Sequence, residues 1–106
     1  MKYRILYSPE AKQDLNEIWE YISEEMANPD AAANMADSIM DTIDSLHAFP
    51  ERGAPLSSVT ETESSYRFVL AENYMAFYRV QEDTVYVDRI FYQRREYLRV
   101  LFGESR

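Results

Sequence analysis

The stretch YMAFYRVQEDTVYVDRIFY, residues 74–92, decides the fold, because two runs of aromatic and β-branched residues flank a short polar break. Such runs are typical of β-strands, and a two-residue turn at Glu82-Asp83 joins them into an antiparallel hairpin. This turn sets the register of the hairpin. The opposed pairs are Val80 with Val85, Arg79 with Tyr86, and Tyr78 with Val87.

The two faces of this hairpin differ in composition. One face carries Ala76, Tyr78, Val80, Val85, Val87 and Phe91, with Arg89 as an exception. The other face carries Met75, Phe77, Arg79, Tyr86, Asp88 and Ile90. We expect the valine-rich face to pack on helices, because branched apolar side chains suit a buried sheet surface. Arginine is costly in a strand unless its charge finds a partner, so Arg89 is expected to pair with a helix carboxylate.

Upstream of the hairpin, a first strand over residues 2–7 leads into two predicted helices. Ser8-Pro9 provides an N-cap and a first helical residue, and Asn28-Pro29 repeats this signal for a second helix over residues 30–48. The apolar face of the first helix holds Ala11, Leu15, Ile18, Trp19 and Ile22, and its polar face holds Asp14, Glu17, Glu20 and Glu24. The apolar seam of the second holds Ala32, Ala36, Ile39, Ile43 and Leu46.

Residues 49–65 are rich in proline and hydroxyl side chains and predict a loop, and residues 66–71 predict another strand. The order is therefore β-α-α-β-β-β within a single domain, residues 1–106. This order predicts an α+β fold, with a helical hairpin packed on one face of an antiparallel sheet. With the first strand beside the last ones, the sheet has four strands. Residues 97–102 fit either a short helical turn or a fifth strand.

The charge of the chain is unevenly distributed. The formal net charge is −8, with four bases and 13 acids in residues 1–65 but seven bases and six acids in residues 66–106. This total argues against nonspecific nucleic-acid binding. The absence of cysteine excludes disulfides and cysteine-ligated zinc. We find no signal peptide and no membrane span in the sequence, and we expect a cytoplasmic protein.

Three motifs in this order resemble the RelE/ParE superfamily, the toxins of type II toxin–antitoxin pairs. They are the opening YSPEAKQDLNEIWEYI, the phrase HAFPERGAPL after the second helix, and the closing YMAFYRVQEDTVYVDRIFYQRREY. The resemblance covers nearly the whole chain. The SPEA opening and the FPERG loop look more similar to ParE than to RelE.

The resemblance implies a toxin that a cognate antitoxin neutralises, with neither a cofactor nor a metal. A ParE-like toxin inhibits DNA gyrase by binding, which implies growth arrest and a role in plasmid stabilization. One alternative is a ribosome-dependent mRNA endoribonuclease, as RelE-like toxins are. The other is an inactive relic that binds only the antitoxin.

The cleavage apparatus of RelE-like toxins is only partly present. The matching positions are Arg67, Arg94, Arg95 and Tyr97, with Tyr97 several residues early. Val69 and Met75 stand where the resemblance calls for bases. RNA cleavage needs a group that activates the 2′-hydroxyl and one that protonates the leaving oxygen, and arginine does both poorly because it hardly loses its proton. We therefore favour a toxin that acts by binding over an enzyme.

A basic rim on the sheet is the candidate surface for the target or the antitoxin. Its residues are Arg67, Arg79, Arg94, Arg95 and Arg99. The alternative is that these arginines form ion pairs within the chain.

Other polar and aromatic residues have simpler interpretations than a site. His47 is expected at a helix end on the surface, and Trp19 in the core. The acids Asp37, Asp41 and Asp44 are expected on a solvated helix face instead of a metal site. The strand tyrosines are expected to pack instead of stacking on bases.

Overall fold

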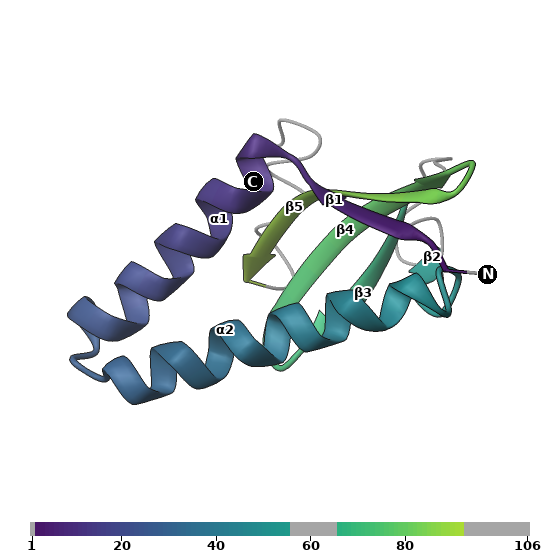
Figure 1. Cartoon of the computed structure of the whole chain (residues 1–106). Helices are drawn as coiled ribbons and strands as arrows, with labels where there is room; N and C mark the ends of the chain where they lie inside the picture. Colours follow the sequence, from purple (N-terminus) through teal and green to yellow (C-terminus); the bar gives the residue numbers. More distant parts are fainter. Residues whose placement is uncertain (1, 56–65, 93–106) are drawn as a thin grey trace.

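The helices and strands follow the predicted order in the computed structural model, which describes residues 2–55 and 66–92 (Figure 1). The helical elements are α1 (Pro9–Glu20), the π-helical turn η1 (Tyr21–Glu25), α2 (Pro29–Asp44) and the 3-10 turn η2 (Ser45–His47). The strands are β1 (Arg4–Tyr7), β2 (Ala54–Pro55), β3 (Arg67–Ala71), β4 (Tyr74–Gln81) and β5 (Thr84–Tyr92). The protein has the predicted α+β fold. No helix in the described part of the chain is long and apolar enough to cross a membrane.

The sheet has five strands in the order β1-β5-β4-β3-β2, one more than predicted. The added strand, β2, is two residues long and lies inside the predicted loop, where it pairs with β3. β1 runs parallel to β5 while the other neighbours are antiparallel, so the sheet is mixed. A parallel pair needs a long crossover connection, and the helical hairpin with β2, β3 and β4 supplies it.

Both helices begin where the sequence predicts, because each has a side-chain cap followed by proline. The Ser8 hydroxyl accepts a hydrogen bond from the Ala11 N–H at 2.9 Å. The Asn28 side chain accepts one from the Ala31 N–H at 3.1 Å. These caps satisfy backbone donors that a helix start leaves open.

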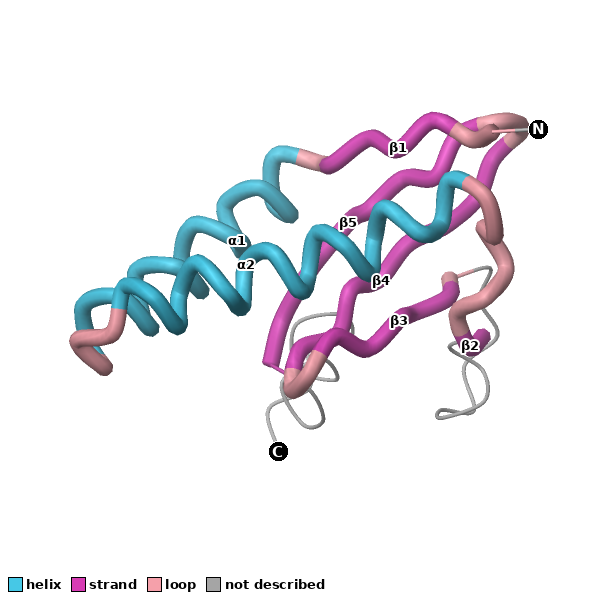
Figure 2. The backbone as a smooth tube through the Cα atoms, turned by 60° about the horizontal axis from the view of Figure 1, so that its bottom comes forward, coloured by secondary structure: helices cyan, strands magenta, loops and turns pink. Residues whose placement is uncertain are grey.

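The main core lies between the helices and the valine-rich face of the sheet, as predicted. Its buried side chains include Ile18, Ile39, Ile43, Tyr78, Val85 and Val87. A second buried cluster, Phe68, Met75, Phe77 and Phe91, lies on the other face of the sheet. Figure 2 shows α2 running along the sheet and the tip of the helical hairpin extending past the ends of the strands.

The predicted register of the β4–β5 hairpin is confirmed, but a β-bulge follows it. Tyr78 pairs with Val87, and the preceding Phe77 pairs with Arg89, so Asp88 is an extra residue in β5. A bulge reverses the sides on which the following residues lie. Ile90 therefore joins the main core and Phe91 joins the second cluster, the opposite of the prediction.

Candidate functional site

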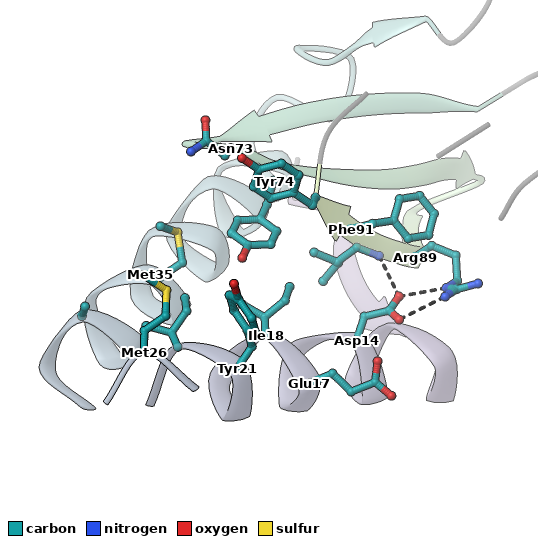
Figure 3. A pocket seen from close by; sticks show the side chains of 14 residues that line it. Asp14, Glu17, Ile18, Tyr21, Met26, Met35, Asn73, Tyr74, Arg89 and Phe91 are labelled. Carbon is teal, nitrogen blue, oxygen red and sulfur yellow. Dashed lines mark hydrogen bonds and ion pairs between the residues drawn. The ribbon is translucent and has the colours of Figure 1, made fainter. Parts of the chain in front are cut away.

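A groove opens between the tip of the helical hairpin and the adjoining ends of β4 and β5 (Figure 3). It has a volume of about 870 Å³. One wall comes from α1 and η1, a second from the start of α2, and a third from the two strands. We call it the apolar groove, after its lining residues Ile18, Tyr21, Met26, Met35, Tyr74 and Tyr92.

Three large side chains of the apolar groove are open to solvent. Tyr21 is 55% exposed, Met26 60% and Tyr92 55%. Single exposed apolar residues are ordinary, and the presence of three of them in one hollow makes it a candidate binding surface. Met26 and Met35 also make the lining adaptable, because unbranched thioether side chains fill irregular space.

Tyr74 is the buried tyrosine of the strand wall. Its side chain is buried, and its ring meets the ring of Tyr92 edge-on with 5.5 Å between centroids. Burial raises the pKa of the Tyr74 hydroxyl, and the nearby Tyr92 and Tyr21 add to the increase. Tyr21 of the helical wall thus lies near Tyr74 and Tyr92 of the strand wall.

A buried carboxylate holds α1 to β5 beside the apolar groove. Asp14 is 7% exposed and accepts two hydrogen bonds from the Arg89 guanidinium, at 2.8 Å from Nε and 3.1 Å from the terminal nitrogen (Figure 3). It also accepts the Ile90 N–H at 2.9 Å. This two-pronged geometry is the strong form of an arginine–carboxylate contact. The prediction that Arg89 pairs with a helix carboxylate is confirmed.

A smaller acidic hollow along α1 shares Asp14, Glu17 and Arg89 with the lining of the apolar groove. This hollow measures about 380 Å³ and is lined by Pro9, Glu10, Gln13, Asp14, Glu17 and Arg89. The hydrogen bond to Asp14 raises the pKa of Arg89, burial acts against that increase, and Glu10 and Glu17 add to it. The one base in the hollow is thus already neutralised by Asp14, while Glu10 and Glu17 remain exposed.

Arg67, a predicted site residue, fastens the loop that follows α2. Its guanidinium donates to the Gly53 carbonyl at 2.7 Å and the Glu51 carbonyl at 3.3 Å. The Tyr78 hydroxyl donates to the Pro50 carbonyl at 2.8 Å and accepts the Gly53 N–H at 3.0 Å. A Cβ on Gly53 would come within 2.5 Å of that hydroxyl, so the FPERG loop needs glycine there.

Arg79, the second described site residue, lies in a polar cluster on the other face of the sheet. It donates to Asp88 and to Gln81, both at 3.2 Å, and its guanidinium lies 4.5 Å from the centre of the Tyr86 ring. The Tyr66 hydroxyl also donates to Asp88, at 2.7 Å. Burial and then this hydrogen bond raise the pKa of Tyr66.

The structure does not bring Arg67 and Arg79 into a shared patch. Arg67 is paired across the sheet with Tyr78, and paired residues point to the same side. Arg79 follows Tyr78 in β4 and therefore points to the opposite side. The remaining predicted site residues, Arg94, Arg95, Tyr97 and Arg99, lie outside the described residues. Their role at a target or antitoxin surface stays a prediction.

Two other expectations from the sequence concern Trp19 and His47. The one for Trp19 is wrong, and the placement of His47 at a helix end is confirmed. Trp19 is 41% exposed and not in the core as predicted, because the buried side of α1 is formed by Ala11, Asp14 and Ile18. His47 ends η2, and its Nδ1 lies 2.7 Å from the Asp44 carbonyl oxygen. Within residues 2–55 and 66–92, no three His, Cys, Asp or Glu side chains are grouped as metal ligands.

The sequence analysis placed Asp14 on the polar face of the first helix, which is wrong because Asp14 is buried, and it did not predict the apolar groove. Asp14 lies three residues after Ala11 and four before Ile18, so helical spacing already places it on the buried side. A charged residue inside an apolar stripe signals a buried partner. The groove left no such signal, because Tyr21 and Tyr92 come to line one groove only through tertiary structure.

The fold and the groove define a small α+β protein with an apolar groove beside a helical hairpin. Residues 5–97 match the family described as the ParE toxin of type II toxin-antitoxin system, parDE, and the chain belongs to this family. The comparison with curated proteins gives no match.

Solved structures share the fold. A chain of the chromosomal ParDE toxin–antitoxin system from P. aeruginosa is 19% identical with a TM-score of 0.73, over 88% of this chain and 98% of that one. A chain of the toxin–antitoxin complex RelBE2 from Mycobacterium tuberculosis is 18% identical with a TM-score of 0.61, over 88% of this chain and 100% of that one. The family match identifies the chain as a ParE-type toxin, and the solved structures show that its fold is shared with chains of both a ParDE and a RelBE2 system.

Proposed function

We propose that this protein arrests growth by binding DNA gyrase and that a cognate antitoxin holds it inactive. The family match over residues 5–97 is the observation that carries this proposal. The similar ParDE and RelBE2 structures are both toxin–antitoxin systems, which supports an antitoxin as partner. The proposal includes action in the cytoplasm and a role in plasmid stabilization.

The described side chains support action by binding and not by catalysis. Arg67, a candidate for the RelE-like cleavage site, and Arg79, a candidate for the target or antitoxin surface, are both engaged in contacts within the chain. A general base or acid must lie within hydrogen-bond reach of the reacting group. His47 follows α2, whereas the two arginines lie on opposite faces of the sheet, so these three residues do not converge on one substrate position.

The basic residues beyond β5 are the proposed contact with gyrase. Residues 66–106 hold seven arginines and no lysine, and Arg94, Arg95 and Arg99 follow β5 closely in sequence. Arginine favours fixed contacts with anionic or aromatic groups on a partner. A chain with a formal net charge of −8 gains little general affinity for nucleic acid, so a local contact is the better explanation for these arginines.

A supercoiling assay tests the proposal directly. Purified full-length protein is titrated into gyrase and relaxed plasmid, and loss of supercoiling is expected together with growth arrest on induction in cells. Arg95→Ala should weaken inhibition by about tenfold, the effect of losing one charged contact. The matched control is Arg4→Ala, at an exposed position of β1, which should change inhibition little.

Two other results would replace this proposal. Unaffected supercoiling with codon-positioned cuts in translated mRNA would show a ribosome-dependent endoribonuclease, and Arg67, Arg94, Arg95 and Tyr97 would then be tested as its site. Unaffected growth on induction would show an inactive relic that binds only the antitoxin.

A further inference from the structure

The face of the sheet that points away from the helices is buried, although no described element covers it. The second cluster lies there, and its exposed fractions are 8% for Phe68, 5% for Met75, 0% for Phe77 and 8% for Phe91. The helices pack on the opposite face (Figure 2). Within residues 2–55 and 66–92, no helix or strand lies over the second cluster.

The side chains of the second cluster do not bury one another completely. Side chains on one face of a sheet stand roughly perpendicular to it, so neighbours shield their flanks and leave their tips open. The Phe77 ring centre lies 6.0 Å from that of Phe68 and 5.3 Å from that of Phe91, with 46° and 49° between the ring planes. Such neighbours shield the sides of Phe77. Its exposed fraction of 0% therefore requires further atoms above the cluster.

Two segments outside the described part of the chain are available as the cover, residues 56–65 and 93–106. Residues 56–65, LSSVTETESS, hold two apolar side chains and two acids. Residues 97–102, YLRVLF, are apolar or aromatic at every position except Arg99. An aromatic cluster favours an apolar cover, because polar groups buried against it would lack hydrogen-bond partners. The composition therefore favours residues 97–102.

The path of the chain also favours residues 97–102. Residues 56–65 connect Pro55 to Tyr66, and Pro55 pairs with Arg67, so this loop leaves and returns at the outer strands of the sheet. The C-terminal residues instead follow β5 directly, next to Phe91 of the second cluster. Residues 92–96 span at most about 17 Å, which is enough for the chain to turn back over Phe77 on the neighbouring strand.

We propose that residues 97–102 fold back over the second cluster and form its cover. Their apolar side chains, Leu98, Leu101 and Phe102 among them, exclude water from Phe77. This burial stabilises the contact without any partner protein. The sheet is then covered on both faces, by the helices on one and by the C-terminal residues on the other.

The cover also fixes the place of the arginines that are proposed to contact gyrase. Arg94 and Arg95 lie between β5 and residues 97–102, and Arg99 lies among the latter. All three are thereby held on the face of the sheet opposite the acidic helical hairpin. A contact surface that is fixed before binding loses less conformational entropy when the partner arrives. This second step rests on the proposed function, whereas the cover itself does not.

A cysteine placed beneath the cover tests its position in the full-length protein. The chain has no cysteine, so Met75→Cys introduces the single thiol, within the second cluster. Its reaction with a maleimide should be at least about tenfold slower than that of Leu70→Cys, because access controls thiol reactivity. Leu70 is 51% exposed and pairs with Met75, so both thiols lie on the same face.

Charged substitutions then remove the cover. Leu101→Glu and Phe102→Glu together should speed the reaction of Met75→Cys at least about tenfold, because a carboxylate is costly in an apolar contact. Both positions are changed because adjacent residues of an extended chain point to opposite sides. Val59→Glu introduces the same charge into residues 56–65 and should leave the rate unchanged. Ala76→Cys, a buried position of β4 that faces the helices, should stay slow in every variant.

Three results would overturn the inference. The first is a Met75→Cys thiol that reacts as fast as Leu70→Cys in the otherwise unchanged chain. The second is a Met75→Cys rate that the two charged substitutions do not alter. The third is acceleration by Val59→Glu alone, which would assign the cover to residues 56–65.

A gentler pair of substitutions keeps the test decisive if the charged pair unfolds the protein. Leu101→Ala with Phe102→Ala then replaces it, and circular dichroism checks that the helices are retained. Faster reaction of Met75→Cys with an unchanged Ala76→Cys rate would support the cover. Equal acceleration of the two thiols would overturn it, because it would show loss of the main core as well.

Gyrase inhibition separates the cover from the proposed function. A protein with Leu101→Glu and Phe102→Glu keeps all three arginines but should inhibit supercoiling at least about fivefold more weakly, because the arginines are no longer held in place. Val59→Glu should inhibit as the wild type does. Unchanged inhibition by a protein whose Met75→Cys thiol has become reactive would overturn the positioning of the arginines alone. A wild-type protein that leaves gyrase active, with the Met75→Cys thiol protected, would overturn the proposed function and support the cover.

Discussion

The junction between α1 and β5 is closed at one end and open at the other. At the closed end, the Ser8 N–H donates to the Val87 carbonyl at 2.9 Å and the Ser8 hydroxyl to the Asp88 carbonyl at 2.8 Å. Asp14 then accepts the Ile90 N–H and the Arg89 guanidinium. At the open end, Tyr21 and Tyr92 face the apolar groove and are more than half exposed.

The two ends differ because β1 is short. β1 pairs with β5 only as far as Val87, and an unpaired strand edge must find other partners. Ser8 and Asp14 supply these partners along the first half of α1. Beyond Ile90, no hydrogen bond between α1 and β5 is found within the described residues. The closed end therefore contributes more to stability than the open end, where Tyr21 and Tyr92 stay exposed.

The largest expected effect is at the closed end. Asp14→Ala should lower the free energy of unfolding by about 3 kcal/mol, because it leaves the Arg89 charge and the Ile90 N–H without their partner. This value is at the low end for a buried pair because the Arg89 side chain is 31% exposed. Urea denaturation followed by circular dichroism measures the change.

Asp41→Ala is the control for Asp14→Ala, since Asp41 is an exposed acid on α2. It should change the free energy of unfolding by less than about 0.5 kcal/mol. A loss below about 1 kcal/mol for Asp14→Ala would contradict the importance of the closed end.

The hydrogen bonds of the neutral Tyr78 hydroxyl should contribute less to the free energy of unfolding than the charged contacts of Asp14. Tyr78→Phe removes the hydrogen bonds to Pro50 and Gly53, and should cost about 1 to 2 kcal/mol in the same denaturation experiment. Tyr86→Phe is the matched control, because the phenolic hydroxyl of Tyr86 makes no hydrogen bond within the described residues and its ring still contacts Arg79. A cost for Tyr78→Phe larger than that of Asp14→Ala would show that charge is not what strengthens the closed end.

Tyr7, the last residue of β1, gives the closed end a dependence on alkaline pH. Burial, and then the charge of Asp44, raise the pKa of Tyr7 to about 12, and its buried hydroxyl lacks a hydrogen-bond partner in the described structure. A raised pKa means that the folded protein holds this proton longer than the unfolded chain. The contribution to stability is complete below about pH 10 and is lost as the pH rises toward 12.

Tyr7→Phe tests this by comparison of the two pH profiles of unfolding. The variant should be as stable as the wild type or slightly more stable at neutral pH, because it removes an unpaired hydroxyl. It should lose less stability than the wild type between pH 10 and 12. The raised pKa values of Tyr66, Tyr74 and Tyr78 contribute to the loss equally in both proteins. Parallel profiles would contradict the prediction.

The smallest effect is expected at the open end. Tyr21→Ser should change the free energy of unfolding by less than about 0.5 kcal/mol, because its side chain is already 55% exposed. A large loss of stability would show that the groove is part of the core and not a surface for a partner.

Local sequence signals predicted the elements well. Ser8-Pro9 and Asn28-Pro29 start the helices because their caps involve residues only three positions away. The Glu82-Asp83 turn set the β4–β5 register because a two-residue turn allows only one alignment of the two strands it joins. The pairing of Arg89 with a helix was expected from the cost of burying its charge.

Nonlocal features were not predictable in the same way. The bulge at Asp88 places Ile90 and Phe91 on the faces opposite to those predicted, and no pattern of alternating residues in β5 indicates the bulge. Arg67 and Arg79 were expected to share a patch, but Arg67 pairs with Tyr78, the residue before Arg79 in β4, so the two arginines lie on opposite faces. Trp19 fits the helical spacing of a core residue, yet α1 lies at the edge of the sheet and leaves it half exposed.

By itself, the sequence determined the helices, the hairpin register, the α+β class and an acidic hairpin, because each follows from contacts between residues near in the chain. Tertiary structure alone decided that β1 lies parallel to β5, that Asp14 is buried against Arg89, and that Tyr21 and Tyr92 enclose a groove. These depend on segments about 70 residues apart, whose meeting no local propensity specifies.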